Sequence, residues 1–305
     1  MSTEQASARF ADLDSWPLPT QIAALYESQL DALAAIRPAL PAITQAASAA
    51  TARLRESDQG RLIYAGAGSS ARIAAQDGAE LAPTFDWPEA RLLLLIAGGP
   101  AALTRAIEGA EDDTQAAGEM LGAHAIGPRD VMIALAASGA TPFTLACASG
   151  AHAAGALTIT IANSPGSPLL TQSSHPILIE TGAEPIAGST RLKAGTAQKV
   201  VLNLLSTAIM TGLGRVYAGR MVEMRASNTK LRQRAVAMVC TLAGCAPAAA
   251  QAALDACGMR VKPAILVAHG LDAPAAVALL ATHRGDLRAA LLAMPTLLAI
   301  DRPSS

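Results

Sequence analysis

Five short apolar runs, separated by stretches with helical periodicity, constrain the fold of this chain most strongly. The runs are Arg61–Ala65, Arg91–Ala97, Val131–Ala136, Leu157–Ala162 and Pro176–Glu180. Several are continuous rather than alternating, which is typical of parallel strands buried on both faces. Strands interleaved with helices imply right-handed βαβ crossovers. We therefore predict an α/β three-layer sandwich around a parallel five-stranded sheet, with any ligand bound beyond the carboxyl ends of the strands.

Helical patterns flank this predicted sheet on both sides. Apolar residues recur at helical spacing from Pro19 to Leu54, and Pro38 and Pro41 divide them into two helices. A long apolar helix over residues 200–213 follows the last strand. Three short helices are expected after it, at Cys245–Leu254, Lys262–His269 and Pro274–Leu280. The chain thus divides into loop and helices over residues 1–57, a sheet domain over 58–235 and a small helical domain over 236–305.

Composition excludes several classes of protein. The 305 residues are 51% apolar with a net charge of −1, so no basic patch favours a nucleic acid or an anionic membrane surface. No uninterrupted apolar run reaches the ~20 residues that span a bilayer, and the acidic N-terminus has no signal-peptide core. The four cysteines lack CxxC pairing and indicate buried thiols in a reducing cytoplasm. The five scattered histidines lack metal-ligand spacing, so we expect no metal site.

The first predicted strand leads into a glycine-rich turn. Residues Arg61–Arg72 read RLIYAGAGSSAR, a strand that stops at Gly66-Ala67-Gly68 and continues into a helix opened by Ser69 and Ser70. Such a turn presents free backbone N–H groups to an anion, and the hydroxyls add donors for phosphate oxygens. An ordinary strand–helix turn without a ligand has the same pattern. The acidic residue that would bind a dinucleotide ribose is missing from the end of the next strand.

Three further strand-end loops are rich in small polar residues. They read ASGATP at 137–142, NSPGSP at 163–168 and GSTRLKAGTAQK at 188–199. A helix needs a single capping hydroxyl, so several such loops, with Lys193 beside them, exceed what capping requires. In the absence of a Walker-type lysine motif, they indicate a sugar phosphate rather than a nucleotide.

Two carboxylates follow the first two strands. Glu80 lies about three helical turns after the glycine-rich turn, and Glu111 lies in an EGAEDD segment after Gly98-Gly99. Two carboxylates flanking a bound sugar can act as acid and base if their environments separate their pKa values. On spacing alone, a solvated acidic run is the simpler interpretation of Glu111.

These segments together resemble the N-acetylmuramic acid 6-phosphate etherases of the sugar isomerase (SIS) superfamily. The motifs are GAGSSAR, GAELAPTF, IAGGPAALTRAIEGAEDD, ASGATPF, NSPGSPL and, most specifically, GSTRLKAGTAQKVVLN. The resemblance is dense over residues 50–235, the sugar-phosphate-binding SIS region, and looser through the helical C-terminal segment. It implies a homodimeric lyase without metal or organic cofactor that cleaves the D-lactyl ether of its substrate in amino-sugar and peptidoglycan recycling.

The resemblance also implies the site residues. Glu80 matches the proton donor and Glu111 the second acid/base. Substrate contacts would fall on Ser69, Ser70, Ser138, Gly139, Thr141, Glu184, Ser189, Thr190 and Lys193.

The chain departs from the family pattern at a few positions. The Arg-Asn pair that usually follows Thr3-Glu4 is missing, and Ala140 and Phe143 stand where the family has arginine and tyrosine. Losing an arginine removes a bidentate anion clamp, so the substrate preference stays open. A sugar-phosphate isomerase and a non-catalytic sugar-phosphate sensor of the same fold are the alternatives. A transcriptional regulator would need an N-terminal DNA-binding domain, for which residues 1–58 are too short and too acidic.

Overall fold

The computed structural model describes residues 5–224, 226 and 228–300, and side chains as far as residue 294. The Thr3-Glu4 pair and the outer ends of the predicted segments 1–57 and 236–305 lie outside these residues. Contacts divide the chain into two compact units. Unit 1 comprises Met1–Glu80 and Pro88–Ile209, and unit 2 comprises Leu81–Trp87 and Met210–Ser305. The boundaries drawn from the sequence at residues 57/58 and 235/236 stay a prediction.

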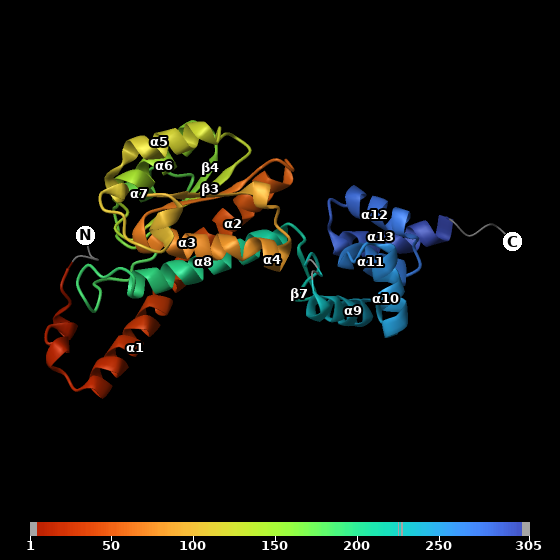
Figure 1. Ribbon diagram of the computed structural model, residues 1–305, viewed down its shortest axis with the longest axis horizontal. Coiled ribbons are helices and arrows are strands. Elements are labelled where there is room, and N and C mark those ends of the chain that lie inside the picture. The colour runs from red at the N-terminus through yellow and green to blue at the C-terminus, as the bar shows by residue number, and fades with distance from the viewer. Residues whose placement is uncertain (1–4, 225, 227, 301–305) are drawn as a thin grey trace. The chain divides into compact units, whose positions relative to one another are not determined.

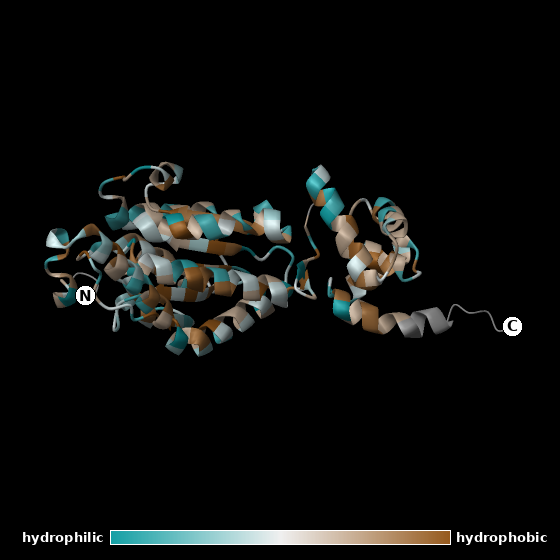
Figure 2. Ribbon diagram, turned by 90° about the horizontal axis from the view of Figure 1, so that it is seen from below, coloured by the Kyte–Doolittle hydropathy of each residue, from teal (hydrophilic) through white to brown (hydrophobic). Residues whose placement is uncertain are grey.

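Unit 1 contains the predicted parallel sheet. Its strands are β1 (Leu62–Gly66), β2 (Leu92–Ile96), β3 (Val131–Ala136), β4 (Leu157–Ala162) and β5 (His175–Leu178), in the spatial order β2-β1-β3-β4-β5. Every neighbouring pair is parallel. All residues of β1 and β3 are buried, as the continuous runs predicted. Hydrophobic residues are brown in Figure 2, which colours the ribbon by hydropathy.

Helices cover both faces of the sheet (Figure 1). α5 (Thr114–Ala123), α6 (Pro142–Ala153) and α7 (Pro168–Thr171) lie on one face, and α2 (Leu40–Arg55) and α3 (Gly68–Ala79) on the other. The long helix α8 (Lys193–Gly212) runs beside α3. The buried Asp77 carboxylate joins them: Oδ1 accepts hydrogen bonds from Asn203 Nδ2 (2.7 Å) and Ser206 Oγ (3.1 Å), and Oδ2 accepts one from Tyr64 OH (2.7 Å).

The N-terminal helices follow the proline pattern. Short 3₁₀ turns at Ala8–Phe10 and Leu13–Ser15 precede α1 (Leu18–Ala34), and Pro38 lies in another at Arg37–Ala39 before α2. α1 carries an exposed apolar stripe at helical spacing, comprising Leu18, Ile22, Tyr26, Leu30 and Leu33. Gln29 lies on the same side of α1 as this stripe, and its Oε1 accepts a 2.5 Å hydrogen bond from Thr196 Oγ1 of α8.

Unit 2 is helical apart from a two-stranded hairpin. It comprises α4 (Leu81–Phe85), β6 (Val216–Tyr217), β7 (Arg220–Met221), α9 (Thr229–Ala243), α10 (Pro247–Ala256), α11 (Val261–Ala268), α12 (Ala273–Thr282) and α13 (Leu287–Ile300). The three predicted short helices correspond to α10, α11 and α12. Val239, Leu254 and Ile265, all fully buried, belong to one apolar cluster. Among the residues described, no single helix is long and apolar enough to cross a membrane; two bent helix pairs match a span by length and composition alone.

Candidate functional site

The strand order reverses between β1 and β3. The chain leaves β1 toward β2 on one side of the sheet and continues from β3 toward β4 and β5 on the other. In open parallel sheets this reversal leaves a crevice beyond the carboxyl ends of the two central strands, where ligands bind. The segments beside it are Ala67–Ser70, which comprises the turn after β1 and the first residues of α3, and the loop Ser138–Thr141 after β3; the sequence singled out both.

The loop after β1 is supported by a buried hydrogen-bonded chain. Ser70 Oγ donates to Gln198 Oε1 (2.8 Å), Gln198 Nε2 donates to Asn163 Oδ1 (2.9 Å), and Asn163 Nδ2 donates to the Ile179 carbonyl (3.1 Å). Gln198 and Asn163 are at most 1% exposed. This series of hydrogen bonds links the segments after β1, β4 and β5 to α8 and holds them in place at the edge of the crevice. Ser70 therefore has a structural partner, whereas Ser69 is partly exposed at the first turn of α3.

The loop after β3 depends on a left-handed glycine. Gly139 has φ +65°, and a Cβ there would overlap Ser167 Oγ of the loop after β4. Ser138 Oγ accepts a hydrogen bond from Ala140 N (3.2 Å), and Thr141 is the N-cap of α6 without a side-chain capping bond. Ser138 and Thr141 are both partly exposed at this edge.

The loop after β5 is built around a buried carboxylate. Glu184 is fully buried, and its Oε2 and Oε1 accept the N–H groups of Lys193 (2.8 Å) and Ala194 (2.9 Å), which begin α8. Burial raises the pKa of Glu184, although these two N–H groups act in the opposite direction. Lys193 Nζ donates to the Ala183 carbonyl (3.2 Å). Glu184 and Lys193 thus hold the loop that carries Ser189 and Thr190, both of which are partly exposed.

A cavity of about 440 Å³ opens at the carboxyl ends of β1 and β2, between the turn at Gly68-Ser69 and the segment after β2. Its wall brings together Ser69 and Glu111, which are far apart in sequence. Arg72 and Arg105 lie on the same wall. Arg72 donates through Nε to the Ala102 carbonyl (3.0 Å) and through Nη2 to the Arg105 carbonyl (3.1 Å), so α3 holds the segment that leads to Glu111.

Glu80 lies elsewhere in the same chain. It is the exposed C-cap of α3, a helix of 12 residues, so about 18 Å of helix separates it from the Gly68 end. Gly78, just before it, packs against Leu92 and Leu94 at the start of β2. The sequence suggested two carboxylates beside one pocket, but one copy of the chain does not bring Glu80 to the cavity that contains Glu111.

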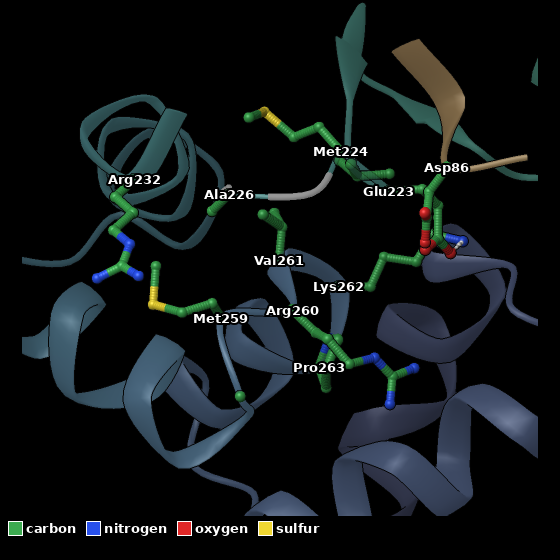
Figure 3. A pocket seen from close by; sticks show the side chains of 12 residues that line it. Asp86, Glu223, Met224, Ala226, Arg232, Met259, Arg260, Val261, Lys262 and Pro263 are labelled. Carbon is green, nitrogen blue, oxygen red and sulfur yellow. Dashed lines mark ion pairs between the residues drawn. The ribbon is translucent and has the colours of Figure 1, made fainter. Parts of the chain in front are cut away.

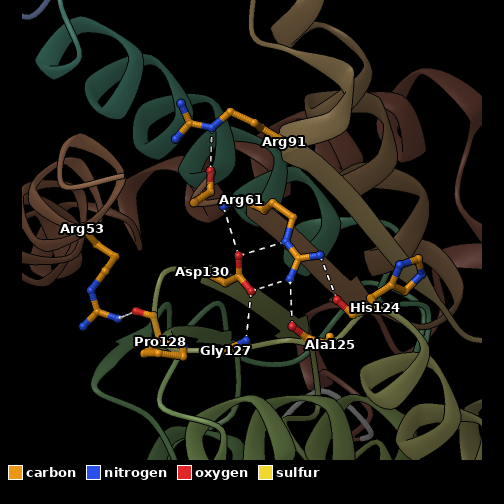
Figure 4. Close-up of polar contacts among 9 residues, drawn as sticks. Arg53, Arg61, Arg91, His124, Ala125, Gly127, Pro128 and Asp130 are labelled. Carbon is orange, nitrogen blue, oxygen red and sulfur yellow. Dashed lines mark hydrogen bonds and ion pairs between the residues drawn. The ribbon is translucent and has the colours of Figure 1, made fainter. Parts of the chain in front are cut away.

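Two other cavities contain none of the predicted site residues. One, of about 450 Å³, lies within unit 2 (Figure 3), where the buried Lys262 ammonium ion-pairs with Glu223 and donates to the Gly285 carbonyl (2.7 Å). The other lies at the amino ends of the strands, beside the Arg61–Asp130 ion pair (Figure 4). Across the described part of the chain, no group of three His, Cys, Asp or Glu side chains is arranged to hold a metal ion.

Comparison with known proteins identifies the family. The chain is 50% identical over 265 residues to an N-acetylmuramic acid 6-phosphate etherase of Deinococcus radiodurans, covering 87% of this chain and 86% of that protein. The chain belongs to this family. It is also 42% identical over 290 residues to the etherase of Salmonella typhimurium, covering 95% of this chain and 97% of that enzyme.

Two domain models match parts of the chain. The SIS domain model matches residues 111–208, and the model of the glucokinase regulatory protein N-terminal SIS domain matches residues 45–152. A phosphoheptose isomerase from Francisella tularensis is 20% identical with a TM-score of 0.48, and it covers 64% of this chain and 100% of its own. The SIS domain match and the five-stranded parallel sheet of unit 1 confirm the SIS-type sandwich expected from the sequence.

Three residues of the site were not selected from the sequence. Gln198 and Asn163 lie within motifs noted above, but their roles depend on partners 128 and 35 residues away, which spacing cannot reveal. Arg105 lies in a segment without regular secondary structure after β2, and only its position on the cavity wall distinguishes it from any other exposed arginine.

Proposed function

We propose that this protein cleaves the D-lactyl ether of N-acetylmuramic acid 6-phosphate, giving N-acetylglucosamine 6-phosphate and D-lactate. The observation that carries the proposal is one cavity in which a serine at a helix N-terminus, Ser69, faces the same space as a carboxylate, Glu111, in a chain of the etherase family. The first can bind phosphate and the second can transfer a proton.

The reaction needs only acid–base chemistry. Opening of the sugar ring exposes the C1 aldehyde, which acidifies the proton at C2, while the lactyl oxygen is attached at C3. One glutamate removes the C2 proton as the C3–oxygen bond breaks, and the other protonates the departing lactate. Water then adds across the resulting double bond, placing a hydroxyl at C3 and a proton at C2. Each positioned acid or base contributes roughly 10²–10⁴ in rate.

We assign the phosphate to the crevice between β1 and β3. Ser69, Ser138 and Thr141 are partly exposed there and each carries a hydroxyl, and Gly139 allows the backbone of its loop to approach closely. Ser70 and Glu184 support the loops through their own hydrogen bonds. We also assign the partly exposed Ser189 and Thr190 to this site, with the buried Lys193 supporting their loop. No metal or organic cofactor takes part in the proposed reaction.

The separation of Glu80 from Glu111 supports a homodimer. If both carboxylates act on one substrate, Glu80 must come from a second copy of the chain, because about 18 Å of α3 lies between it and the cavity of its own copy. The stripe on α1, with Ile22 59% and Tyr26 65% exposed, offers an apolar face that a second copy would bury. We therefore propose a dimer in which each site combines Glu111 of one copy with Glu80 of the other.

An isotope experiment tests the chemistry. In water labelled with ¹⁸O, elimination and hydration place the label at C3 of the amino sugar and none in lactate, and in deuterated water the product gains deuterium at C2. Label in lactate would disprove this mechanism even if the ether is cleaved. A sugar-phosphate isomerase would exchange the C2 hydrogen without releasing lactate, and a sensor would bind the sugar phosphate and do neither.

A complementation experiment tests the shared site. Glu80→Gln and Glu111→Gln are each expected to lose at least 10² in turnover while still binding ligand. The two inactive variants are then mixed in equal amounts and allowed to exchange subunits. Half of the resulting dimers are hybrids, and in each hybrid one of the two sites combines an intact Glu80 with an intact Glu111. About a quarter of the wild-type activity should therefore return. If both glutamates belong to the same copy, the mixture stays inactive, and the cross-subunit proposal is wrong.

The proposed compartment is the cytoplasm. All four cysteines are free thiols, and none is bridged to another. Free thiols are maintained in a reducing compartment.

A further inference from the structure

Arg105 contributes a cation to the wall of the candidate active-site cavity. The wall carries two guanidinium groups, and that of Arg72 already donates to two backbone carbonyls. Among the described residues, the Arg105 side chain has no hydrogen-bond or ion-pair partner, and it is exposed. Its backbone carbonyl is held by Arg72, so the side chain extends from an anchored position.

The same wall is otherwise acidic. Glu108 and Glu111 both line the cavity, and both are exposed. An additional carboxylate entering this space meets like charge unless a cation pairs with it. A guanidinium suits this task because its planar N–H groups match the two oxygens of a carboxylate.

The proposed substrate carries two anionic groups. The phosphate is accounted for by the hydroxyls and backbone N–H groups at the carboxyl ends of β1 and β3. The lactyl carboxylate, joined through the ether oxygen at C3, must lie close to the glutamates that act at C2 and C3. On this cavity wall, Arg105 is the cation available for it.

We propose that Arg105 binds the lactyl carboxylate and thereby makes the site selective for a 3-O-carboxyalkyl sugar phosphate over a neutral ether. This inference rests on the proposed function. Arg105 is a specificity-determining binding residue and transfers no proton.

The test compares N-acetylmuramic acid 6-phosphate with its lactamide, in which a neutral carboxamide of the same shape replaces the carboxylate. Binding of both compounds, and of N-acetylglucosamine 6-phosphate, is measured by calorimetry in the Glu111→Gln background with and without Arg105→Ala. With Arg105 present, the acid should bind about 10- to 100-fold tighter than the lactamide. Arg105→Ala should bring this ratio close to one and leave the affinity for N-acetylglucosamine 6-phosphate within about twofold. Arg105→Lys keeps the charge without the planar fork and should give an intermediate ratio.

Arg129→Ala is the matched control, because it removes one exposed guanidinium at the amino edge of the sheet. It should leave the acid-to-lactamide ratio unchanged. The inference is overturned if Arg105→Ala preserves the ratio, if it weakens all three ligands equally, or if neither lactyl compound binds. Lactate release by the wild-type protein is assayed separately. A ratio that depends on Arg105 without lactate release would refute the proposed function and leave the carboxylate assignment intact.

Discussion

Replacing Gly139 by alanine is expected to damage the loop between β3 and α6 for two separable reasons. Gly139 has φ +65°, and holding alanine in this left-handed region costs about 1–2 kcal/mol. The added Cβ would also overlap Ser167 Oγ, lie 2.5 Å from Ser167 Cβ and lie 3.0 Å from Ala162 Cβ. Rotating the Ser167 hydroxyl cannot relieve the contact with its Cβ, so the backbone of one loop must move.

Overpacking of this kind costs about 1–3 kcal/mol. The total expected loss of unfolding free energy is therefore about 2–5 kcal/mol. Urea denaturation followed by circular dichroism measures this loss as a shift in midpoint, provided that the slope stays constant. Because Ser138 and Thr141 lie beside Gly139, we also expect weaker binding of sugar phosphate by the folded variant.

Gly166 provides a matched control in the neighbouring loop. Its φ is +67°, but a Cβ there meets no atom within 4 Å. Gly166→Ala should lose only the conformational part, about 1–2 kcal/mol. The difference between the two alanine variants isolates the steric part, and Ser167→Gly should recover part of it in the Gly139→Ala background. Equal destabilisation by Gly139→Ala and Gly166→Ala, with no rescue by Ser167→Gly, would refute the steric argument.

Three further outcomes are expected. Asp77→Asn leaves Tyr64, Asn203 and Ser206 donating toward an amide rather than a carboxylate, and should cost about 2–4 kcal/mol of unfolding free energy. The control Asp58→Asn, at an exposed site, should cost little, and equal losses from the two variants would contradict the role of Asp77. Burial favours the protonated form of Asp130, but the Arg61 guanidinium and the N–H groups of Gly127 and Arg61 outweigh burial and lower the pKa of Asp130. The ionised Asp130 therefore stabilises the fold above its unfolded-state pKa of about 3.9, and this contribution is lost as the pH falls through the lower pKa of the folded state. The stability difference between wild type and Asp130→Asn should therefore be constant from about pH 5 to 7 and shrink below about pH 4 in urea titrations; a constant difference at all pH values would contradict the ion-pair argument. Burial raises the pKa of Cys147 to about 12. A thiol reagent at pH 8 should therefore modify the partly exposed Cys240 and Cys245 and spare Cys147 until the protein unfolds. Labelling of Cys147 at the same rate as Cys240 would contradict the burial of Cys147.

Local sequence patterns were enough to predict the strands of the sheet and the helices between them. The continuous apolar run at Val131–Ala136 coincides with β3 to the residue, because a strand buried on both faces favours apolar side chains at every position. Leu157–Ala162 likewise coincides with β4, although the buried Thr158 and Thr160 interrupt its apolar residues; Thr158 Oγ1 accepts a hydrogen bond from Ser174 N. Proline positions divided α1 from α2, and Gly66-Ala67-Gly68 marked the end of β1 and the start of α3. Each of these boundaries is set by residues close together in the sequence, so a short segment of sequence is enough to predict it.

Which polar groups meet depends on how the elements pack together. Ser70 and Gln198 are 128 residues apart, Asp77 and Asn203 are 126 apart, and no periodicity connects either pair. Glu80 and Glu111 both follow strands in the sequence. Glu80 nevertheless lies at the C-terminal end of α3, whereas Glu111 lies on the wall of the cavity at the N-terminal end of this helix. The physical reason is that hydrophobic pattern and turn chemistry fix the elements, whereas the distance between two side chains depends on the lengths and packing of all the elements between them.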